Sequence, residues 1–133
     1  MKGVKILDSS AVLAYFEGEE GGKHVTSLLK EGSEKEKNLL ISVVNWGEVL
    51  YVVETRYGKG RRDEIEHIMS QMHLEVIDVG KDLAREAAQI KASRKLPYAD
   101  CFAAALTRTR KGVLVTTDKD FKVVDAEINI EWL

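Results

Sequence analysis

Five short apolar segments along the chain predict the strands of a buried sheet. "VKIL" (residues 4–7), "NLLIS" (38–42) and "GVLVTT" (112–117) are nearly continuous apolar runs. "LEVIDV" (74–79) alternates between apolar and polar positions, and "INIEWL" (128–133) is a weaker candidate. Continuous apolar runs of this length are typical of strands that are buried on both faces.

Helical patterns fill the intervals between these segments. From Trp46 to Tyr57, apolar residues at i, i+3, i+4, i+7 and i+11 form one face that we expect to pack on the core. Further helices are predicted over residues 11–18, 23–30, 60–73, 82–93 and from 100 onward. Gly18 and Gly58 are expected to end helices, and the charged stretch 31–38 is expected to be an exposed loop. Strands that alternate with helices in this way predict a parallel sheet covered on both faces.

Four acidic residues stand at the ends of the predicted strands or just beyond them. Asp8 directly follows the first strand, and Asp118 directly follows "GVLVTT". Glu48 lies six residues past "NLLIS", off the apolar face of its helix, and Asp100 begins the apolar run "DCFAAAL". Sites in open parallel sheets lie outside the carboxyl ends of the strands. We therefore expect the four carboxylates to meet at one edge of the sheet.

Each of these acids also has a simpler explanation when it is taken alone. Asp8 and Asp100 could be helix caps or turn residues, Asp118 could be a turn residue, and Glu48 could lie on a solvated helix face. Together they favour a site. Two like charges about 5 Å apart repel by roughly 3 kcal/mol at an effective dielectric of 20, so a cluster must bind protons or cations. Oxygen-only ligands suit Mg²⁺ or Mn²⁺.

Three motifs carry a resemblance to a known family. "ILDSSAVLAYF", "ISVVNWGEVLYV" and "LPYADCFAAALTRTRKGVLVTTDKDF" occur in this order over nearly the whole chain. Together they resemble the PIN-domain ribonucleases, in particular the VapC-type toxins of toxin–antitoxin pairs. The resemblance implies a PIN-like three-layer α/β/α fold with a central parallel sheet of four to five strands flanked by helices. It also implies a single nuclease domain over residues 1–133.

The resemblance implies site residues and partners as well. The positions that match the family's catalytic and metal-binding acids are Asp8, Glu48, Asp100 and Asp118. Asp8 and Asp100 would be direct metal ligands, whereas Glu48 and Asp118 would bind directly or through water. The implied activity is Mg²⁺- or Mn²⁺-dependent cleavage of RNA by a homodimer, with an antitoxin protein that blocks the site. Asp120 is a spare acid in "TDKDF".

Polar and basic residues surround these acids in the sequence. Four polar neighbours would hold the acids in place or cap helices: Ser9, Ser10, Asn45 and Thr116. Seven cations could form a positive rim for RNA phosphates: Arg94, Lys95, Arg108, Arg110, Lys111, Lys119 and Lys122. For residues 108–111, cations that complement the dipole at a helix end are the better explanation.

The bulk composition narrows the class of protein. The chain has 133 residues with 20 Lys and Arg against 22 Asp and Glu, and this balance excludes a strongly basic nucleic-acid coat protein. The single Cys101 cannot form an internal disulfide, which favours a reducing compartment. No apolar run approaches the roughly 20 residues that span a bilayer. We therefore expect a cytoplasmic protein without a membrane segment.

Three other functions remain open at the level of sequence. The first is a PIN-domain nuclease that acts in RNA processing, on structured nucleic acid or on DNA flaps. The second is a doubly wound signalling or nucleotide-binding module, although "DSSAV" after the first strand lacks the glycines of a phosphate loop. The third is a non-catalytic α/β binding module that keeps the acids for structure, which loss of metal binding would identify.

Overall fold

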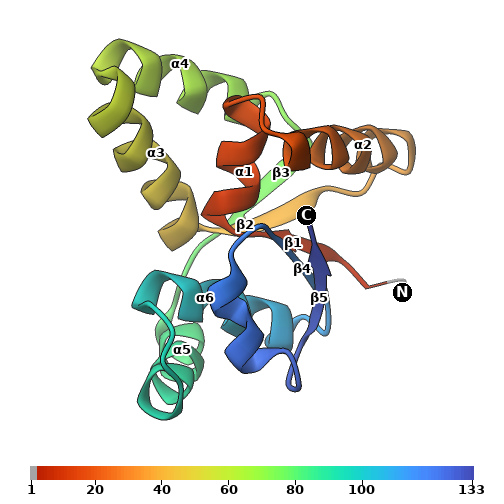
Figure 1. The fold of residues 1–133 in the computed structure, drawn as a ribbon. Coiled ribbons are helices and arrows are strands. Elements are labelled where there is room, and N and C mark those ends of the chain that lie inside the picture. Colours follow the sequence, from red (N-terminus) through yellow and green to blue (C-terminus); the bar gives the residue numbers. More distant parts are fainter. Residues whose placement is uncertain (1–2) are drawn as a thin grey trace.

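The computed structural model describes residues 3–133 and forms one five-stranded parallel sheet between two layers of helices (Figure 1). The strands are β1 (Lys5–Leu7), β2 (Leu39–Ser42), β3 (Leu74–Ile77), β4 (Val113–Thr116) and β5 (Asn129–Trp132). Their spatial order is β3-β2-β1-β4-β5, and every neighbouring pair is parallel. The chain builds outward from β1 to β3 on one side and then adds β4 and β5 on the other side. The topological switch point therefore lies between β1 and β4.

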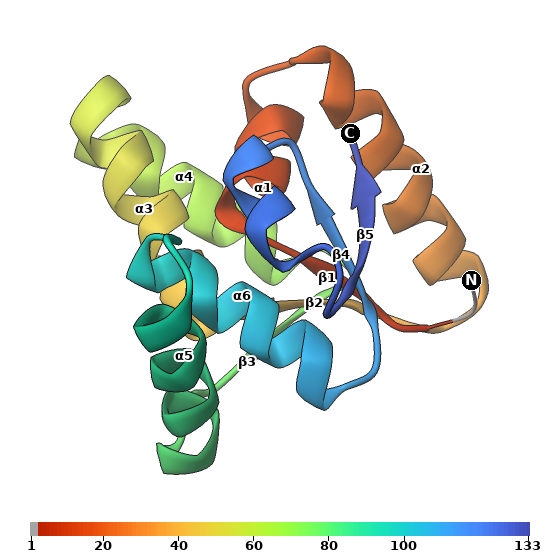
Figure 2. The same ribbon diagram turned by 60° about the horizontal axis from the view of Figure 1, so that its bottom comes forward.

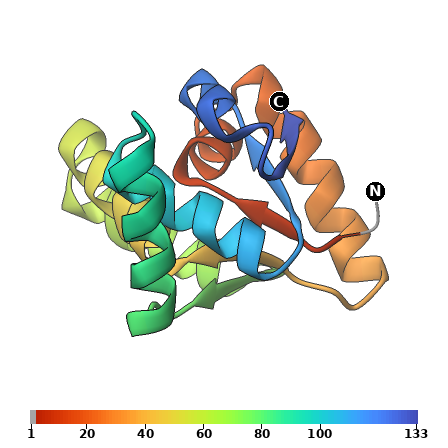
Figure 3. The ribbon, with the colours of Figure 1, turned by 90° about the horizontal axis from the view of Figure 1, so that it is seen from below.

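The helices cover the two faces of the sheet in separate groups. In chain order they are α1 (Ser9–Phe16), α2 (Glu20–Glu34), α3 (Val43–Tyr57), α4 (Lys59–Ser70), α5 (Lys81–Ser93), α6 (Tyr98–Thr109) and the 3₁₀ helix η1 (Lys119–Val124). Helices α5, α6 and η1 pack on one face, and α1 to α4 pack on the other. Figures 2 and 3 show α6 lying along the sheet with α5 beside it. The predicted three-layer α/β/α architecture with a central parallel sheet is confirmed.

Alternation along the central strands produces these two cores. Ile6 of β1 and Leu114 of β4 face α6, whereas the adjacent Leu7 and Val115 face α1 and α3. All four side chains are almost completely buried. Both faces of a parallel sheet must be apolar when helices cover both, and this explains why these strands appear in the sequence as continuous apolar runs.

The predicted loop over residues 31–38 is wrong for its first four residues. Helix α2 continues to Glu34 because its apolar face, with Val25 and Leu28 buried, stays on the sheet while the charged side chains point to solvent. Lys35 and Glu31 form an i,i+4 ion pair of 2.8 Å on that solvent side. Alternating charge is compatible with an exposed helix face as well as with a loop.

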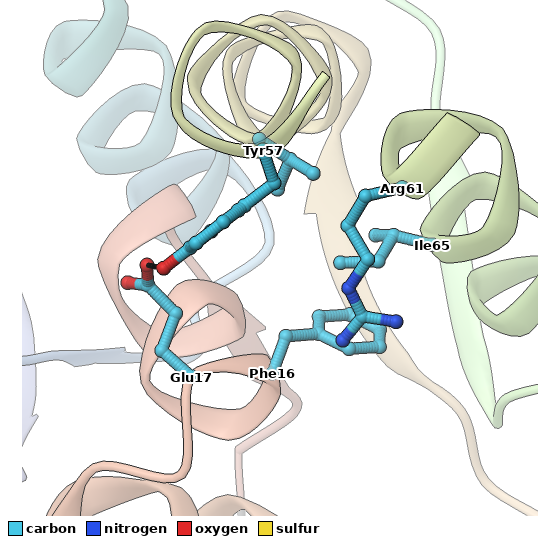
Figure 4. Close-up of a pocket in the computed structure, with 6 residues that line it drawn as sticks. Phe16, Glu17, Tyr57, Arg61 and Ile65 are labelled. Carbon is cyan, nitrogen blue, oxygen red and sulfur yellow. Dashed lines mark hydrogen bonds between the residues drawn. The ribbon is translucent and has the colours of Figure 1, made fainter. Parts of the chain in front are cut away.

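The prediction that Tyr57 packs in the core is also wrong. Tyr57 ends α3, is 56% exposed and donates a hydrogen bond of 2.7 Å from its hydroxyl to Glu17 at the end of α1 (Figure 4). It stands at a cavity of about 380 Å³ that is lined by Phe16, Glu17, Val53, Tyr57, Arg61 and Ile65. The core stops at Val53, because α1 ends before it can cover the last turn of α3.

A membrane-spanning helix is absent from residues 3–133, where none of the helices combines the required length with sufficient apolar character.

Candidate metal centre

The carboxyl ends of β1 and β4 lie side by side and are each followed by an acidic residue. Asp8 follows β1 directly, and Asp118 lies two residues after the end of β4. The two strands pair in parallel register from Lys5 opposite Val113 to Leu7 opposite Val115. The acids therefore stand at the switch point, the place where open α/β sheets bind their ligands.

Asp8 is both a helix cap and a buried acid. Its carboxylate accepts hydrogen bonds from the Ala11 amide at 3.0 Å, from the Ser10 hydroxyl at 2.8 Å and from the Thr116 hydroxyl at 2.8 Å. Only 1% of the residue is exposed. Burial raises the pKa of Asp8 to about 6, although the three hydrogen bonds lower it. The capping explanation is correct for Asp8, and it does not account for this degree of burial.

Asp100 is not a cap. It lies within the first turn of α6, whose N-cap is Pro97, and it is 6% exposed. None of the ion pairs among residues 3–133 includes Asp100. Burial raises the pKa of Asp100 to about 8, with further contributions from the nearby Asp118, Asp8 and Glu48. The described chain thus places three acids near Asp100 and no cation against it.

Asp100 meets two acids from the turn after β4. Carboxylate oxygens of Asp100, Asp118 and Asp120 all lie within 4.8 Å of one another. Asp118 caps η1 by accepting a hydrogen bond of 2.9 Å from the Asp120 amide, and this turn directs both side chains to Asp100. The sequence left Asp120 as a spare acid, and the structure places it in the cluster. Asp8 and Glu48 lie outside this group of three.

Glu48 approaches the cluster from α3, on the β2 side of the sheet. It is half-buried, and the Ser9 hydroxyl donates a hydrogen bond of 2.6 Å to its carboxylate. Three residues earlier, the Asn45 side-chain amide donates a bond of 3.2 Å to the Ala99 carbonyl in the first turn of α6. This bond ties the helix that carries Glu48 to the helix that carries Asp100.

Ser42 is a supporting residue that the sequence reasoning missed. It caps α3 by accepting a bond of 3.1 Å from the Asn45 amide, and its hydroxyl donates to the Asn45 side-chain oxygen at 2.6 Å. Ser42 and Asn45 are completely buried. A serine between the end of a strand and the start of a helical pattern was the available signal, because serine is a preferred N-cap residue.

The four polar residues expected near the acids all contact the site. Ser9 binds Glu48, and Asn45 joins α3 to α6, as described above. The Thr116 hydroxyl donates to Asp8 and accepts from the Asp118 amide at 2.9 Å. The Ser10 hydroxyl donates to Asp8 and accepts from the Thr117 amide at 3.1 Å. These bonds fix the turn after β4 against the turn after β1.

The donor set of this centre fits a hard divalent cation. The three clustered side chains offer only carboxylate oxygens, which suit Mg²⁺ or Mn²⁺ rather than Zn²⁺. Asp8 adds a fourth carboxylate beside this group, held in place by Ser10, Ala11 and Thr116. The raised pKa values of Asp8 and Asp100 indicate that these groups bind protons when no cation is present.

Only part of the possible rim of seven cations lies near the acids, and the helix-dipole explanation fits residues 108–111 at the end of α6. Arg108 pairs with Glu86, and Arg110 and Lys111 lie at the end of α6 before β4, at the opposite edge of the sheet from the acids. Arg94 pairs with Glu127 at 3.0 Å. Lys119 stands next to the cluster, because it lies between Asp118 and Asp120.

A five-stranded parallel sheet with clustered carboxylates at its switch point defines the class: an α/β protein with an acidic metal centre as its candidate site. A family model described as "PIN domain" matches residues 5–127. The chain therefore belongs to the PIN-domain family, and the resemblance seen in its three motifs is confirmed. No curated protein sequence shows significant similarity to the chain.

Solved structures share this fold over nearly their whole length. A chain of the DNA-bound VapBC complex from Salmonella typhimurium is 23% identical, with a TM-score of 0.74 and 96% of each chain covered. A chain of DNA-bound VapBC2 from Rickettsia felis is 20% identical, with a TM-score of 0.75 and 98% of each chain covered. VapC20 from Mycobacterium tuberculosis, described as a Sarcin-Ricin loop cleaving toxin, is 18% identical. Its TM-score is 0.69, with 93% of this chain and 95% of that chain covered.

Proposed function

We propose that this chain is a metal-dependent endoribonuclease and the toxin of a toxin–antitoxin pair. The observation that carries the proposal is the group of Asp100, Asp118 and Asp120 beside the buried Asp8, at the switch point of a PIN-domain sheet. The proposal is supported by the shared fold of VapC20, described as a Sarcin-Ricin loop cleaving toxin, and of two VapBC complexes. Residues 1–133 would act as one nuclease domain.

Mg²⁺ or Mn²⁺ would be held by the acids expected from the sequence. Asp8 and Asp100 would bind the ion directly, and Glu48 and Asp118 would bind it directly or through water. The chemistry supplied by a bound ion would be activation of a water molecule and neutralisation of charge on the attacked phosphate. The proposal rests on the oxygen-only donor set and on the absence, within residues 3–133, of an ion pair to Asp100.

The chain's own groups would orient the reaction. Asp8 cannot rotate freely, because three hydrogen bonds hold its carboxylate at the end of β1. Glu48 accepts from Ser9 through one oxygen and has its other oxygen available to orient the attacking water or to take its proton. Asn45 keeps Glu48 and Asp100 at a fixed separation by joining α3 to the start of α6.

The test is cleavage of a labelled single-stranded RNA by purified protein with Mg²⁺, with Mn²⁺ and with EDTA. We expect cleavage with either ion, none with EDTA and none by the Asp100→Asn variant. Asp63→Asn, which changes an exposed acid on α4, is the matched control and should cleave normally. Cleavage by Asp100→Asn at the wild-type rate would overturn the proposed site. Metal binding without cleavage of any RNA would favour the non-catalytic binding module.

The proposed partners are an antitoxin protein and a second copy of the chain. Expression of the wild-type chain in the cytoplasm should arrest cell growth, whereas expression of the Asp100→Asn variant should not. Co-expression of a small protein encoded next to this chain should restore growth if that protein is the antitoxin. Light scattering on the purified chain should give the mass of a homodimer. Normal growth with the wild-type chain, at an expression level equal to that of the variant, would argue against a toxin.

A further inference from the structure

Trp132 is an exposed aromatic side chain at the same edge of the sheet as the carboxylates. It is the last residue of β5 and is 36% exposed. In the β4–β5 ladder it pairs with Thr116, the residue whose hydroxyl binds both Asp8 and the Asp118 amide. Register partners in a ladder point to the same face of the sheet. The indole is thus one strand away from the centre of the acidic site.

Lys119 lies over this indole. Its ammonium nitrogen is 5.1 Å from the centroid of the Trp132 ring, within the range of a cation–π contact. Lys119 lies between Asp118 and Asp120, whose carboxylates meet Asp100. One turn of chain therefore directs two carboxylates to the candidate metal centre and one ammonium to the exposed ring.

The ring and the ammonium form a pair that suits one nucleotide. Aromatic side chains stack on unpaired bases of single-stranded RNA, and lysine binds phosphate oxygens. None of the ion pairs among residues 3–133 includes Lys119, so its ammonium is available to move from the ring to a phosphate. Lys122, also exposed on η1, adds positive charge on this side of an otherwise acidic edge.

We propose that Trp132 and Lys119 form a subsite that binds an unpaired base and its phosphate next to the cleaved bond. The inference rests on the proposed function and assigns to that activity a substrate with an unstacked nucleotide at one fixed position. Trp132 is a specificity-determining residue in this arrangement. It stacks on the base, whereas the carboxylates act on the phosphodiester.

The first test compares Trp132→Ala, Trp132→Phe and wild type on one single-stranded RNA and on copies with one abasic nucleotide at each position in turn. We expect Trp132→Ala to raise KM about 10-fold, the effect of losing one stacked base, and Trp132→Phe to retain most of the affinity. When the abasic nucleotide occupies the position that Trp132 binds, wild type and Trp132→Ala should have the same KM. Tyr51→Ala removes an exposed aromatic on α3 and is the matched control, with an unchanged KM.

The second test measures binding without cleavage and separates the two proposals. Trp46→Phe leaves Trp132 as the single tryptophan, and short RNA should quench its fluorescence, whereas an abasic ribose-phosphate oligomer should not. If RNA quenches the fluorescence but the protein cleaves no RNA, the subsite is supported and the proposed nuclease activity is contradicted. Cleavage by wild type, with equal KM for Trp132→Ala and no quenching, would overturn the subsite and leave the nuclease intact.

Discussion

The Thr116 hydroxyl donates a hydrogen bond of 2.8 Å to the Asp8 carboxylate, across the pair of strands at the centre of the sheet. The same hydroxyl accepts a bond of 2.9 Å from the Asp118 amide. A completely buried threonine thus joins the two turns that carry the acids. Residues that orient ligating carboxylates in this way tune both the geometry and the affinity of a metal centre.

Replacing Thr116 by valine should weaken the candidate site without removing an acid. Valine has nearly the same shape, so the expected change is the loss of one bond to a charged group and of one acceptor. We expect a loss of stability of about 2 kcal/mol and a 10- to 100-fold loss of metal affinity or activity. Urea denaturation and cleavage rates measure the two effects. Thr116→Ser keeps the hydroxyl and should retain most of the stability and of the metal affinity. A Thr116→Val variant with normal metal affinity would contradict the role of Thr116 in orienting the acids.

Asp100→Asn should abolish cleavage and stabilise the metal-free protein at high pH. Burial and the neighbouring acids raise the pKa of Asp100 from 3.8 to about 8. Between these values the unfolded chain releases the proton while the folded chain keeps it. The contribution of Asp100 to stability is therefore fully present below pH 3.8 and is lost as the pH rises through about 8. Asparagine carries no proton to lose.

The measurement is denaturation of wild type and Asp100→Asn in EDTA at pH 5, 7 and 9. The variant should gain stability over wild type across this series, by about 1 kcal/mol or more at pH 9, since one pKa unit corresponds to about 1.4 kcal/mol. Asp63→Asn should show no such trend. A stability difference that stays constant from pH 5 to pH 9 would mean that Asp100 ionises normally.

The sheet and the edge where the acids meet could be predicted from the sequence for physical reasons. Strands buried on both faces are largely apolar, which made residues 4–7 and 112–117 recognisable. The rule that parallel strands share a carboxyl edge then brought Asp8 and Asp118 together. The spatial order of the strands carries no such local signal. That order makes β1 and β4 neighbours and allows Thr116 to reach Asp8.

Two details depended on geometry that a linear pattern does not contain. Asp120 joins the cluster because Asp118 caps η1, and a turn of this kind cannot be distinguished in "TTDKD" from an ordinary strand end. The helical face that runs from Trp46 to Tyr57 has the correct period, but a period does not show where the neighbouring helix ends. The last turn of α3 extends past α1, and Tyr57 is exposed there.

Mn²⁺ should stabilise the protein more at pH 8.5 than at pH 6. The ion must displace protons from Asp100, with a pKa of about 8, and from Asp8, with a pKa of about 6. At 100 times its dissociation constant a bound ligand adds about 2.7 kcal/mol to stability. Thermal denaturation at both pH values measures the effect, and calorimetry in two buffers counts the protons released. Equal stabilisation at both pH values, with no proton release, would place the ion away from these two groups.

Asp118 and Asp120 should differ in importance although both belong to the cluster. Asp118 is half-buried and caps η1, and its backbone amide donates a hydrogen bond to the Thr116 hydroxyl. Asp120 is exposed. Removing a half-buried ligand that is held in a fixed turn costs more than removing an exposed one, which water can replace in an ion's coordination sphere. We therefore expect Asp118→Asn to lower cleavage at least 100-fold and Asp120→Asn about 10-fold. Raising the Mn²⁺ concentration should rescue Asp120→Asn but not Asp118→Asn. Equal losses that neither variant recovers with metal would make Asp120 a direct ligand of the same rank as Asp118.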